Sequence, residues 1–238
     1  MADFHQNGNI ATLHNLRTQT GEDLTRELVS FSTTRKISLI LPSLYSELEG
    51  DALPKILDEL AQVPYLHRIV IGLDQADEAQ YRHAREFFSV LPQNHVVIWN
   101  NSPRMKEIEA RLEKLGLAPS EPGKGKNVWG CIGFLLACAD STVVAIHDCD
   151  IVTYEKDMLS RLVYPVCNPN FPYQVAKGYY ARVGDGKING RVSRMLVSPL
   201  LIALKRVIGD RDYLDFLRAF RYPLSGEFAM RTSILPDL

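Results

Sequence analysis

The chain has 238 residues, of which 46% are hydrophobic and 23% are charged, a composition typical of a folded globular protein. Its 27 Lys and Arg residues against 28 Asp and Glu residues leave a net charge of −1. This balance argues against a general nucleic-acid-binding protein, because such a protein carries a basic excess. The length suits one large α/β domain or two small domains.

The location of the protein is indicated by three sequence features. Residues 1–19 lack the basic and then apolar pattern of a secretory signal. The long apolar window at residues 128–146 is interrupted by Asp140, which favours a buried helix followed by a buried strand over a membrane span. The four cysteines form no C-x-x-C pair, so buried reduced thiols are favoured over a zinc site. We expect a cytoplasmic protein without a membrane span.

Strand and helix patterns alternate along the first 150 residues. Strand patterns cover residues 36–44, 67–74, 95–100 and 141–148, and helix patterns cover residues 51–63, 76–91 and 102–116. We expect the first strand to stop at Pro42 and Asp51 to cap the helix that follows. The alternation predicts a parallel sheet with helices on both faces.

The later part of the chain is predicted to extend the same domain. Residues 173–183 have the pattern of a fifth strand, and helices are expected over residues 191–209, bent at Pro199, and over residues 212–222. We therefore assign residues 36–238 to one domain and residues 1–35 to an N-terminal extension that packs on it.

Two aspartates follow the fourth predicted strand in the stretch HDCDIV. Asp148 and Asp150 are two residues apart, so an alternating strand would direct both to one side. Neighbouring carboxylates repel unless a cation lies between them, and Mg²⁺ or Mn²⁺ prefers such hard oxygen ligands together with phosphate oxygens. A D-x-D pattern also occurs by chance in surface turns, so alone it leaves both readings open.

A lysine between two glycines precedes the apolar window, in PGKGK at residues 122–126. The glycines would let the backbone approach a ligand closely, and Lys124 would then bind a phosphate. The alternative is a flexible basic turn before a helix that begins at Asn127.

Taken together, these motifs resemble a known family. LPSL, PGKG, HDCD, GRVSR and PLSGEFAMR occur in the order found in the glucosyl-3-phosphoglycerate synthases, and the resemblance extends over about residues 37–231. The mannosylglycerate synthases share PGKG, D-x-D and P-L-x-G-E. The resemblance implies a GT-A glycosyltransferase fold, which is a Rossmann-like, mostly parallel sheet with helices on both faces.

The resemblance also implies a role for individual residues. The nucleotide would be bound by Pro42, Ser43, Leu44, Glu47, Lys124 and Asp148, with the first three holding the base and Asp148 the ribose. Asp150 would ligate Mg²⁺ or Mn²⁺, and Glu227 would hold sugar hydroxyls, so that Lys124, Asp150 and Glu227 form the catalytic set. The acceptor would be bound by Gly190, Arg191 and Ser193.

Part of this assignment agrees with chemistry visible in the residues themselves. A phosphorylated acid needs cations and backbone N–H groups, and Arg191, Arg194 and a helix N-terminus supply them. An ordinary basic helix start remains open for Arg194, and a helix-capping glutamate remains open for Glu227.

The chain departs from the family pattern in two places. Ser46 replaces the first of two glutamates that the family has after the first strand, while Glu47 keeps the second. The family also has a metal-ligating histidine late in its sequence, whereas this sequence has no histidine after Asp150. We therefore expect a catalytic domain that is incomplete at its C-terminus, and a chain that binds nucleotide but transfers sugar poorly.

The predicted reaction transfers glucose from UDP-glucose or GDP-glucose to the 2-hydroxyl of 3-phosphoglycerate, with retention of configuration implied by the resemblance. Mannosyl or other glycosyl transfer to a glycerate-type acceptor, and a non-catalytic nucleotide-sugar-binding module, remain alternatives. A nucleotidyltransferase is disfavoured because LPSLYSELEG lacks a glycine-rich loop. A homodimer is left open.

Overall fold

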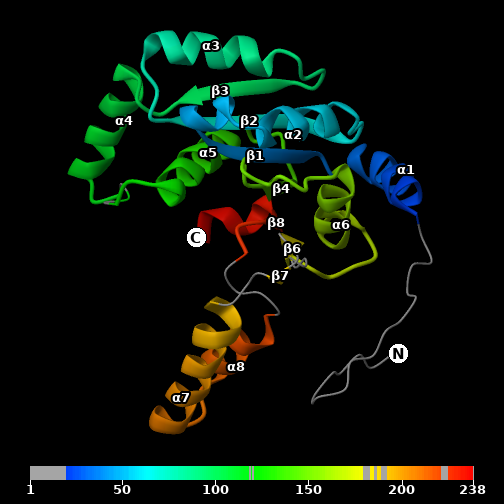
Figure 1. The fold of residues 1–238 in the computed structure, drawn as a ribbon, viewed down its shortest axis with the longest axis vertical. Helices are drawn as coiled ribbons and strands as arrows, with labels where there is room; N and C mark the ends of the chain where they lie inside the picture. The colour runs from blue at the N-terminus through cyan, green and yellow to red at the C-terminus, as the bar shows by residue number, and fades with distance from the viewer. Residues whose placement is uncertain are drawn as a thin grey trace.

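One six-stranded sheet organises the computed structural model, which describes residues 20–117, 119, 121–178, 183–184, 187–188, 192–220 and 225–237. The strand order is β3-β2-β1-β4-β8-β5 (Figure 1). The strands are β1 (Ile37–Leu44), β2 (Leu66–Asp74), β3 (His95–Trp99), β4 (Val143–Ile146), β5 (Val175–Lys177) and β8 (Phe228–Arg231). The first four in space are parallel, and β8 is antiparallel to both β4 and β5. The predicted mostly parallel sheet is confirmed.

Helices cover both faces of this sheet. One face packs against α1 (Gly21–Ser32), α2 (Ala52–Ala61), α3 (Glu78–Phe88) and α6 (Lys156–Cys167) in a large apolar cluster. The other face packs against α5 (Lys124–Cys138), whose Cys131 and Leu135 are buried on Ile40, Val70 and Val144. The alternation of apolar strands and amphipathic helices produces this layered core, because each strand must bury both of its faces.

Three helices begin at a residue whose side chain caps the first turn. Thr20 and Asp77 form capping boxes for α1 and α3, and Ser102 accepts the Met105 N–H at the start of α4 (Pro103–Lys114). Asp51 occupies the N-cap position of α2, as predicted, but its side chain makes no capping hydrogen bond.

β1 continues through Pro42 to Leu44 instead of stopping at the proline, which corrects the predicted strand end. The Ile40 carbonyl accepts the His147 N–H at 3.2 Å, so the backbone of Ile40 faces β4. Backbone groups alternate sides along a strand, and Pro42 therefore faces the same side, beyond the last β4 residue, Ile146. A missing N–H removes no ladder bond there.

The long apolar window divides into α5 and β4, as predicted. α5 begins at Lys124 and not at Asn127, so Lys124 and Lys126 lie on its first turn and the flexible-turn alternative is wrong. Gly123 precedes the helix with φ +132°, a left-handed region value that favours glycine. Within the described part of the chain, no helix is both long and apolar enough to cross a membrane.

The C-terminal third departs most from expectation. Neither α6 nor β8 was predicted, and the predicted fifth strand is the three-residue β5 followed, after undescribed residues, by β6 (Val183–Gly184). β6 pairs with β7 (Lys187–Ile188).

The helix predicted over residues 191–209 is a π-helical turn, η2 (Ser193–Val197), and then α7 (Ser198–Ile208), with Pro199 in the first turn of α7. α8 (Asp212–Ala219) matches its prediction, and short 3₁₀ turns form η1 (Tyr45–Glu49) and η3 (Thr232–Asp237).

Candidate functional site

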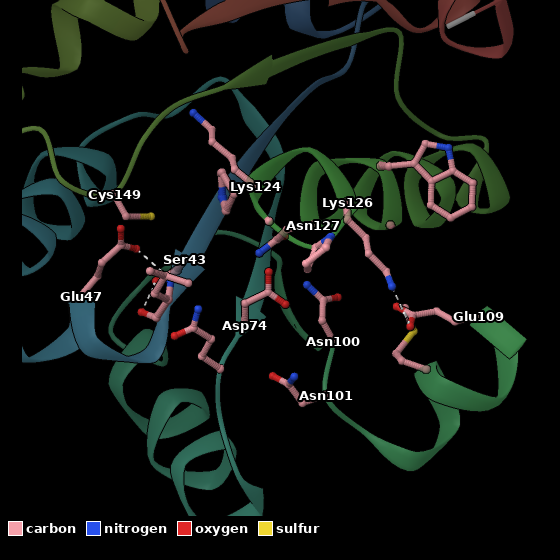
Figure 2. A pocket seen from close by; sticks show the side chains of 18 of the residues that line it. Ser43, Glu47, Asp74, Asn100, Asn101, Glu109, Lys124, Lys126, Asn127 and Cys149 are labelled. Carbon is pink, nitrogen blue, oxygen red and sulfur yellow. Dashed lines mark hydrogen bonds and ion pairs between the residues drawn. The ribbon is translucent and has the colours of Figure 1, made fainter. Parts of the chain in front are cut away.

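A cavity of about 500 Å³ lies at the carboxyl ends of the parallel strands (Figure 2). In open α/β sheets this edge is where ligands bind. The cavity is lined by residues of β1 and η1, of the ends of β2 and β3, of the start of α5 and of the segment after β4. Of the residues predicted for the site, it brings together Pro42, Ser43, Leu44, Glu47, Lys124, Asp148 and Asp150.

An ion pair joins the PGKG and D-x-D motifs. The Lys124 ammonium donates to the Asp148 carboxylate across the cavity. The cation next to this aspartate is thus a lysine of the chain itself. Both aspartates were expected on an alternating strand, but β4 ends at Ile146 and residues 149–150 form a turn, so this prediction is wrong. Asp148 and Asp150 nevertheless line the same cavity, while Cys149 between them is buried.

Asp150 is the exposed carboxylate of this pair. Among the described residues, no group of three or more His, Cys, Asp or Glu side chains could enclose a metal ion. A single hard carboxylate fits Mg²⁺ or Mn²⁺ that takes its other ligands from diphosphate oxygens and water. The donor set therefore fits a metal that binds together with a nucleotide.

Glu47 lines the cavity beside Leu44. Its Oε2 atom accepts the Leu44 N–H at 2.9 Å. Burial raises the pKa of Glu47, the charges of Asp150 and Asp148 add to the increase, and the Leu44 N–H acts against it. Any cation that enters between these three carboxylates is favoured electrostatically.

Several cavity residues escaped the sequence analysis. Asp74 ends β2, Asn100 and Asn101 follow β3, and Asn127 extends from α5; Figure 2 shows these side chains close together. Burial raises the pKa of Asp74, and the amides of Asn100 and Asn127 act against that increase. The signal was available, because polar residues directly follow two predicted parallel strands whose carboxyl ends must share one edge.

Asn127 also fixes α5 against the sheet. Its Nδ2 atom donates to the Gly72 carbonyl at 2.7 Å, and a Cβ atom added at Gly72 would lie 1.8 Å from Asn127 Oδ1. Only glycine on β2 admits the helix this closely. One turn of α5 then carries Lys124 into the cavity and Lys126 to its wall, where Lys126 pairs with Glu109 of α4 at 3.0 Å.

Glu227 is nearly fully buried, with 2% of its surface exposed, and it directly precedes β8. The helix-cap alternative is therefore wrong. Its Oε2 atom accepts the Ser225 hydroxyl at 2.7 Å, while Oε1 has no hydrogen-bond partner within the described residues. A Cβ atom added at Gly226 would lie 2.6 Å from both Lys124 Nζ and Asp148 Oδ2, so this turn rests on the ion pair.

The predicted acceptor residues are less fully described. Gly190 and Arg191 lie outside the described residues. Ser193 begins the π-helical turn η2, and no contact of its side chain is described. The acceptor assignment therefore stays a prediction.

The sheet and its edge cavity define a Rossmann-like α/β fold of the kind that binds ligands at the carboxyl ends of its strands. No family model matches the chain. It is 46% identical over 229 residues to the glucosyl-3-phosphoglycerate synthase of Persephonella marina, a match that covers 96% of this chain and 57% of that protein. It is 38% identical over 239 residues to the synthase of the same name from Methanococcoides burtonii, covering 99% of this chain and 58% of that protein. The chain thus spans a little over half the length of these curated relatives.

Solved structures support the same fold. The Mycobacterium tuberculosis glucosyl-3-phosphoglycerate synthase in complex with Mn²⁺, UDP and glucosyl-3-phosphoglycerate is similar with a TM-score of 0.61 at 22% identity, over 95% of this chain and 66% of that chain. Its complex with Mn²⁺, UDP-glucose and phosphoglyceric acid gives a TM-score of 0.60 at 21% identity, over 99% and 65%. The resemblance of this chain to the glucosyl-3-phosphoglycerate synthases is confirmed over nearly its whole length.

Proposed function

We propose that the protein transfers glucose from a nucleotide diphosphate glucose to 3-phosphoglycerate, with retention of anomeric configuration. The observation that carries this proposal is the single cavity that gathers the β1 end, the Lys124–Asp148 pair and Asp150. The two curated relatives, named for this reaction, give the proposal its acceptor and sugar.

Each residue has one role in this reaction. The backbone of Pro42, Ser43 and Leu44 holds the base, with Glu47 bracing the Leu44 N–H. Lys124 gives up part of its contact with Asp148 to bind the diphosphate. Asp148 accepts a hydrogen bond from a ribose hydroxyl. Mg²⁺ or Mn²⁺, when bound at Asp150, stabilises negative charge on the departing diphosphate.

Glu227 provides the contact with the transferred sugar. Its Oε1 atom is buried without a partner in the described part of the chain, and an unpaired buried acceptor is costly until a hydroxyl donates to it. Gly190, Arg191 and Ser193 bind the phosphate and carboxylate of the acceptor, which require cations and backbone donors.

The reaction is tested by product mass after incubation with Mn²⁺, 3-phosphoglycerate and each of UDP-glucose, GDP-glucose and GDP-mannose. Glucosyl-3-phosphoglycerate is expected as the product, and Glu227→Gln should lower its yield. Product from GDP-mannose alone would replace the proposal by mannosyl transfer. Nucleotide binding without transfer, in a protein that extends over the full length of its relatives, would replace it by a binding module.

For the nucleotide, we propose that GDP-glucose is preferred over UDP-glucose. Asp74 lies opposite Leu44 in the β1–β2 register, at the cavity end assigned to the base. A carboxylate can accept two adjacent N–H groups of guanine but only one from uracil, where carbonyl groups flank it. Competition of GDP and UDP in calorimetry tests this, and Asp74→Asn should reduce the preference for GDP. Equal affinities that Asp74→Asn leaves unchanged would contradict it.

We further propose that two copies of the chain associate through α7 and α8. Neither helix reaches the sheet in Figure 1, and many of their apolar side chains are exposed, with Val207 of α7 at 82% and Tyr213 of α8 at 68%. An apolar patch of this extent is typical of an interface. Light scattering should give a dimer mass that Val207→Asp lowers; a monomer for the unchanged chain would refute the association.

The location and the domain division are also proposals. The four cysteines are free thiols, which supports a cytoplasmic location. We assign residues 36–238 to the catalytic domain and residues 1–35 to an extension, and the packing of Leu28 from α1 into the core beside α6 supports an extension that docks on the domain.

A further inference from the structure

Lys177, the last residue of β5, has no role in the site described so far. It is half-buried and pairs with Phe228 in the antiparallel β5–β8 ladder. Its Nζ atom donates to the Ser225 carbonyl at 2.7 Å and lies 5.7 Å from the centroid of the Phe228 ring. The ammonium is therefore turned inward, toward the turn that precedes β8, although a lysine usually keeps its charge in water.

This turn, formed by residues 225–227, separates Lys177 from the Lys124–Asp148 pair. Gly178 donates its N–H to the Glu227 carbonyl at 2.8 Å, which fixes the turn on the β5 side. On its other side, Gly226 approaches the ion pair so closely that no Cβ atom would fit. A change at Lys177 is consequently transmitted to the cavity through three residues.

The charge of Lys177 also interacts with a buried carboxylate, that of Glu227. Glu227 is nearly fully buried and has hydrogen bonds described on Oε2 alone. Burial lowers the pKa of Lys177, the Glu227 carboxylate acts against that decrease, and the Lys124 ammonium adds to it. A carboxylate that is buried without a nearby cation becomes costly and favours its neutral form, which accepts hydrogen bonds less well.

We propose that Lys177 is a positioning residue for the sugar of the donor. Its ammonium anchors the Ser225 carbonyl and stabilises the buried Glu227 carboxylate, so that Oε1 of Glu227 stays available as an acceptor in the turn whose Gly226 contacts the Lys124–Asp148 pair. The inference rests on the proposed function, in which Glu227 binds the hydroxyls of the transferred sugar.

The role predicts a selective defect. Calorimetry would measure UDP, GDP, UDP-glucose and GDP-glucose binding to the unchanged chain, Lys177→Met and Lys177→Arg in the presence of Mn²⁺. Methionine keeps the apolar stem against Phe228 and removes the charge. We expect Lys177→Met to weaken binding of the better nucleotide-glucose roughly tenfold and to change binding of the matching nucleotide less than about twofold, because the sugar contact alone depends on the charge. Lys177→Arg should restore most of the loss.

A double-mutant cycle separates this role from a general structural one. In a Glu227→Gln background, Lys177→Met should weaken nucleotide-glucose binding less than about twofold further, because the two residues act as one unit. Additive losses, equal losses for nucleotide and nucleotide-glucose, or no loss at all would overturn the proposal. Should Lys177→Met fail to fold, Lys177→Gln replaces it with the same expectation, and circular dichroism checks both. If the unchanged chain binds neither UDP nor GDP, the proposed function itself fails, and the role of Lys177 fails with it.

Discussion

The parallel half of the sheet and its antiparallel edge differ in where their polar residues lie. In β3, β2, β1 and β4, the strand interiors are almost entirely apolar, and polar residues begin where the strands end. At the edge formed by β8 and β5, polar groups enter the buried region itself, as Ser225, Glu227 and the inward-turned Lys177 illustrate.

This difference assigns separate tasks to the two regions. The parallel half gains its stability from apolar burial and offers the nucleotide a rigid edge, since β2, β1 and β4 each pair with a strand on both sides. At the antiparallel edge, buried polar groups form a hydrogen-bonded turn that is complementary to a polar ligand. Burying these groups lowers the stability that an apolar edge would have. Changes in the first region should therefore affect folding most, and changes in the second should affect binding most.

The largest expected effect is on the free energy of unfolding. Ile40 of β1 is fully buried and Met230 of β8 is 6% exposed, and both belong to the cluster beneath α5. Urea unfolding should show a loss of about 3–4 kcal/mol for Ile40→Ala and about 2 kcal/mol for Met230→Ala. Val90→Ala, at a position that is 65% exposed, is the control. An equal or larger loss at Met230 would break the proposed difference between the two regions.

Lys124 lies where the two regions meet, since it pairs with Asp148 and is covered by Gly226. Lys124→Ala should weaken binding of UDP or GDP roughly a hundredfold, or about 2.7 kcal/mol, because a charged contact with the diphosphate is lost. Lys114→Ala, at the exposed end of α4, is the matched control and should bind as the unchanged chain does. Calorimetry checks both, and nucleotide binding that survives Lys124→Ala would move the diphosphate elsewhere.

His147 lies between the last residue of β4 and the D-x-D turn. The pH dependence of the free energy of unfolding tests whether it is buried there. Burial lowers the pKa of His147 to about 4, and both ring nitrogens lack a hydrogen-bond partner among the described residues. Below an unfolded-state pKa of about 6.5, the unfolded chain takes up a proton that the folded chain does not, so stability falls as the pH is lowered from about 6.5 to about 4.

The measurement is urea unfolding at pH 7.5 and pH 5. The histidine should account for a loss of about 2 kcal/mol between these pH values. His147→Phe should remove this loss, and the comparison cancels the opposite contributions of Glu47 and Asp74, whose pKa values are raised. The same pH dependence in His147→Phe would refute the assignment.

The smallest expected effect concerns the metal. Mn²⁺ should bind measurably only with a nucleotide, because Asp150 supplies one exposed carboxylate and the diphosphate must supply further ligands. Asp150→Ala should reduce the gain in nucleotide affinity on adding Mn²⁺ by about tenfold, or about 1.4 kcal/mol. Asp58→Ala, exposed on α2, is the control. Tight Mn²⁺ binding without nucleotide, unchanged by Asp150→Ala, would exclude this site.

The sequence predicts the parallel half well, because strand and helix patterns there are local and long. It predicts that Asp148 and the β1 end meet in the cavity, since both follow from one rule about strand ends. β8 was missed because four residues whose partners are distant β4 and β5 carry little local signal. Pro165 within α6 obscured that helix in the same way, since proline is unfavourable inside a helix.

The contacts that tune the site were not accessible to pattern analysis. Two contacts depend on distances between separate elements: the pairing of Lys124 with Asp148, and the close approach of Gly226 to this ion pair. Asp74 and Asn100 stand at predicted strand ends, but neither belongs to a motif that marks it as a ligand-binding residue.

The close contact between Asn127 and Gly72 limits which substitutions this protein can accept at the two positions. A side chain at position 72 would occupy the space of the Asn127 amide, and a different residue at position 127 would leave the Gly72 carbonyl without its donor. Neither site can change alone without turning α5 about its axis and moving both of its lysines relative to the cavity. The two positions are therefore expected to covary among homologous sequences, and libraries that aim to alter the nucleotide preference should randomise them as a pair.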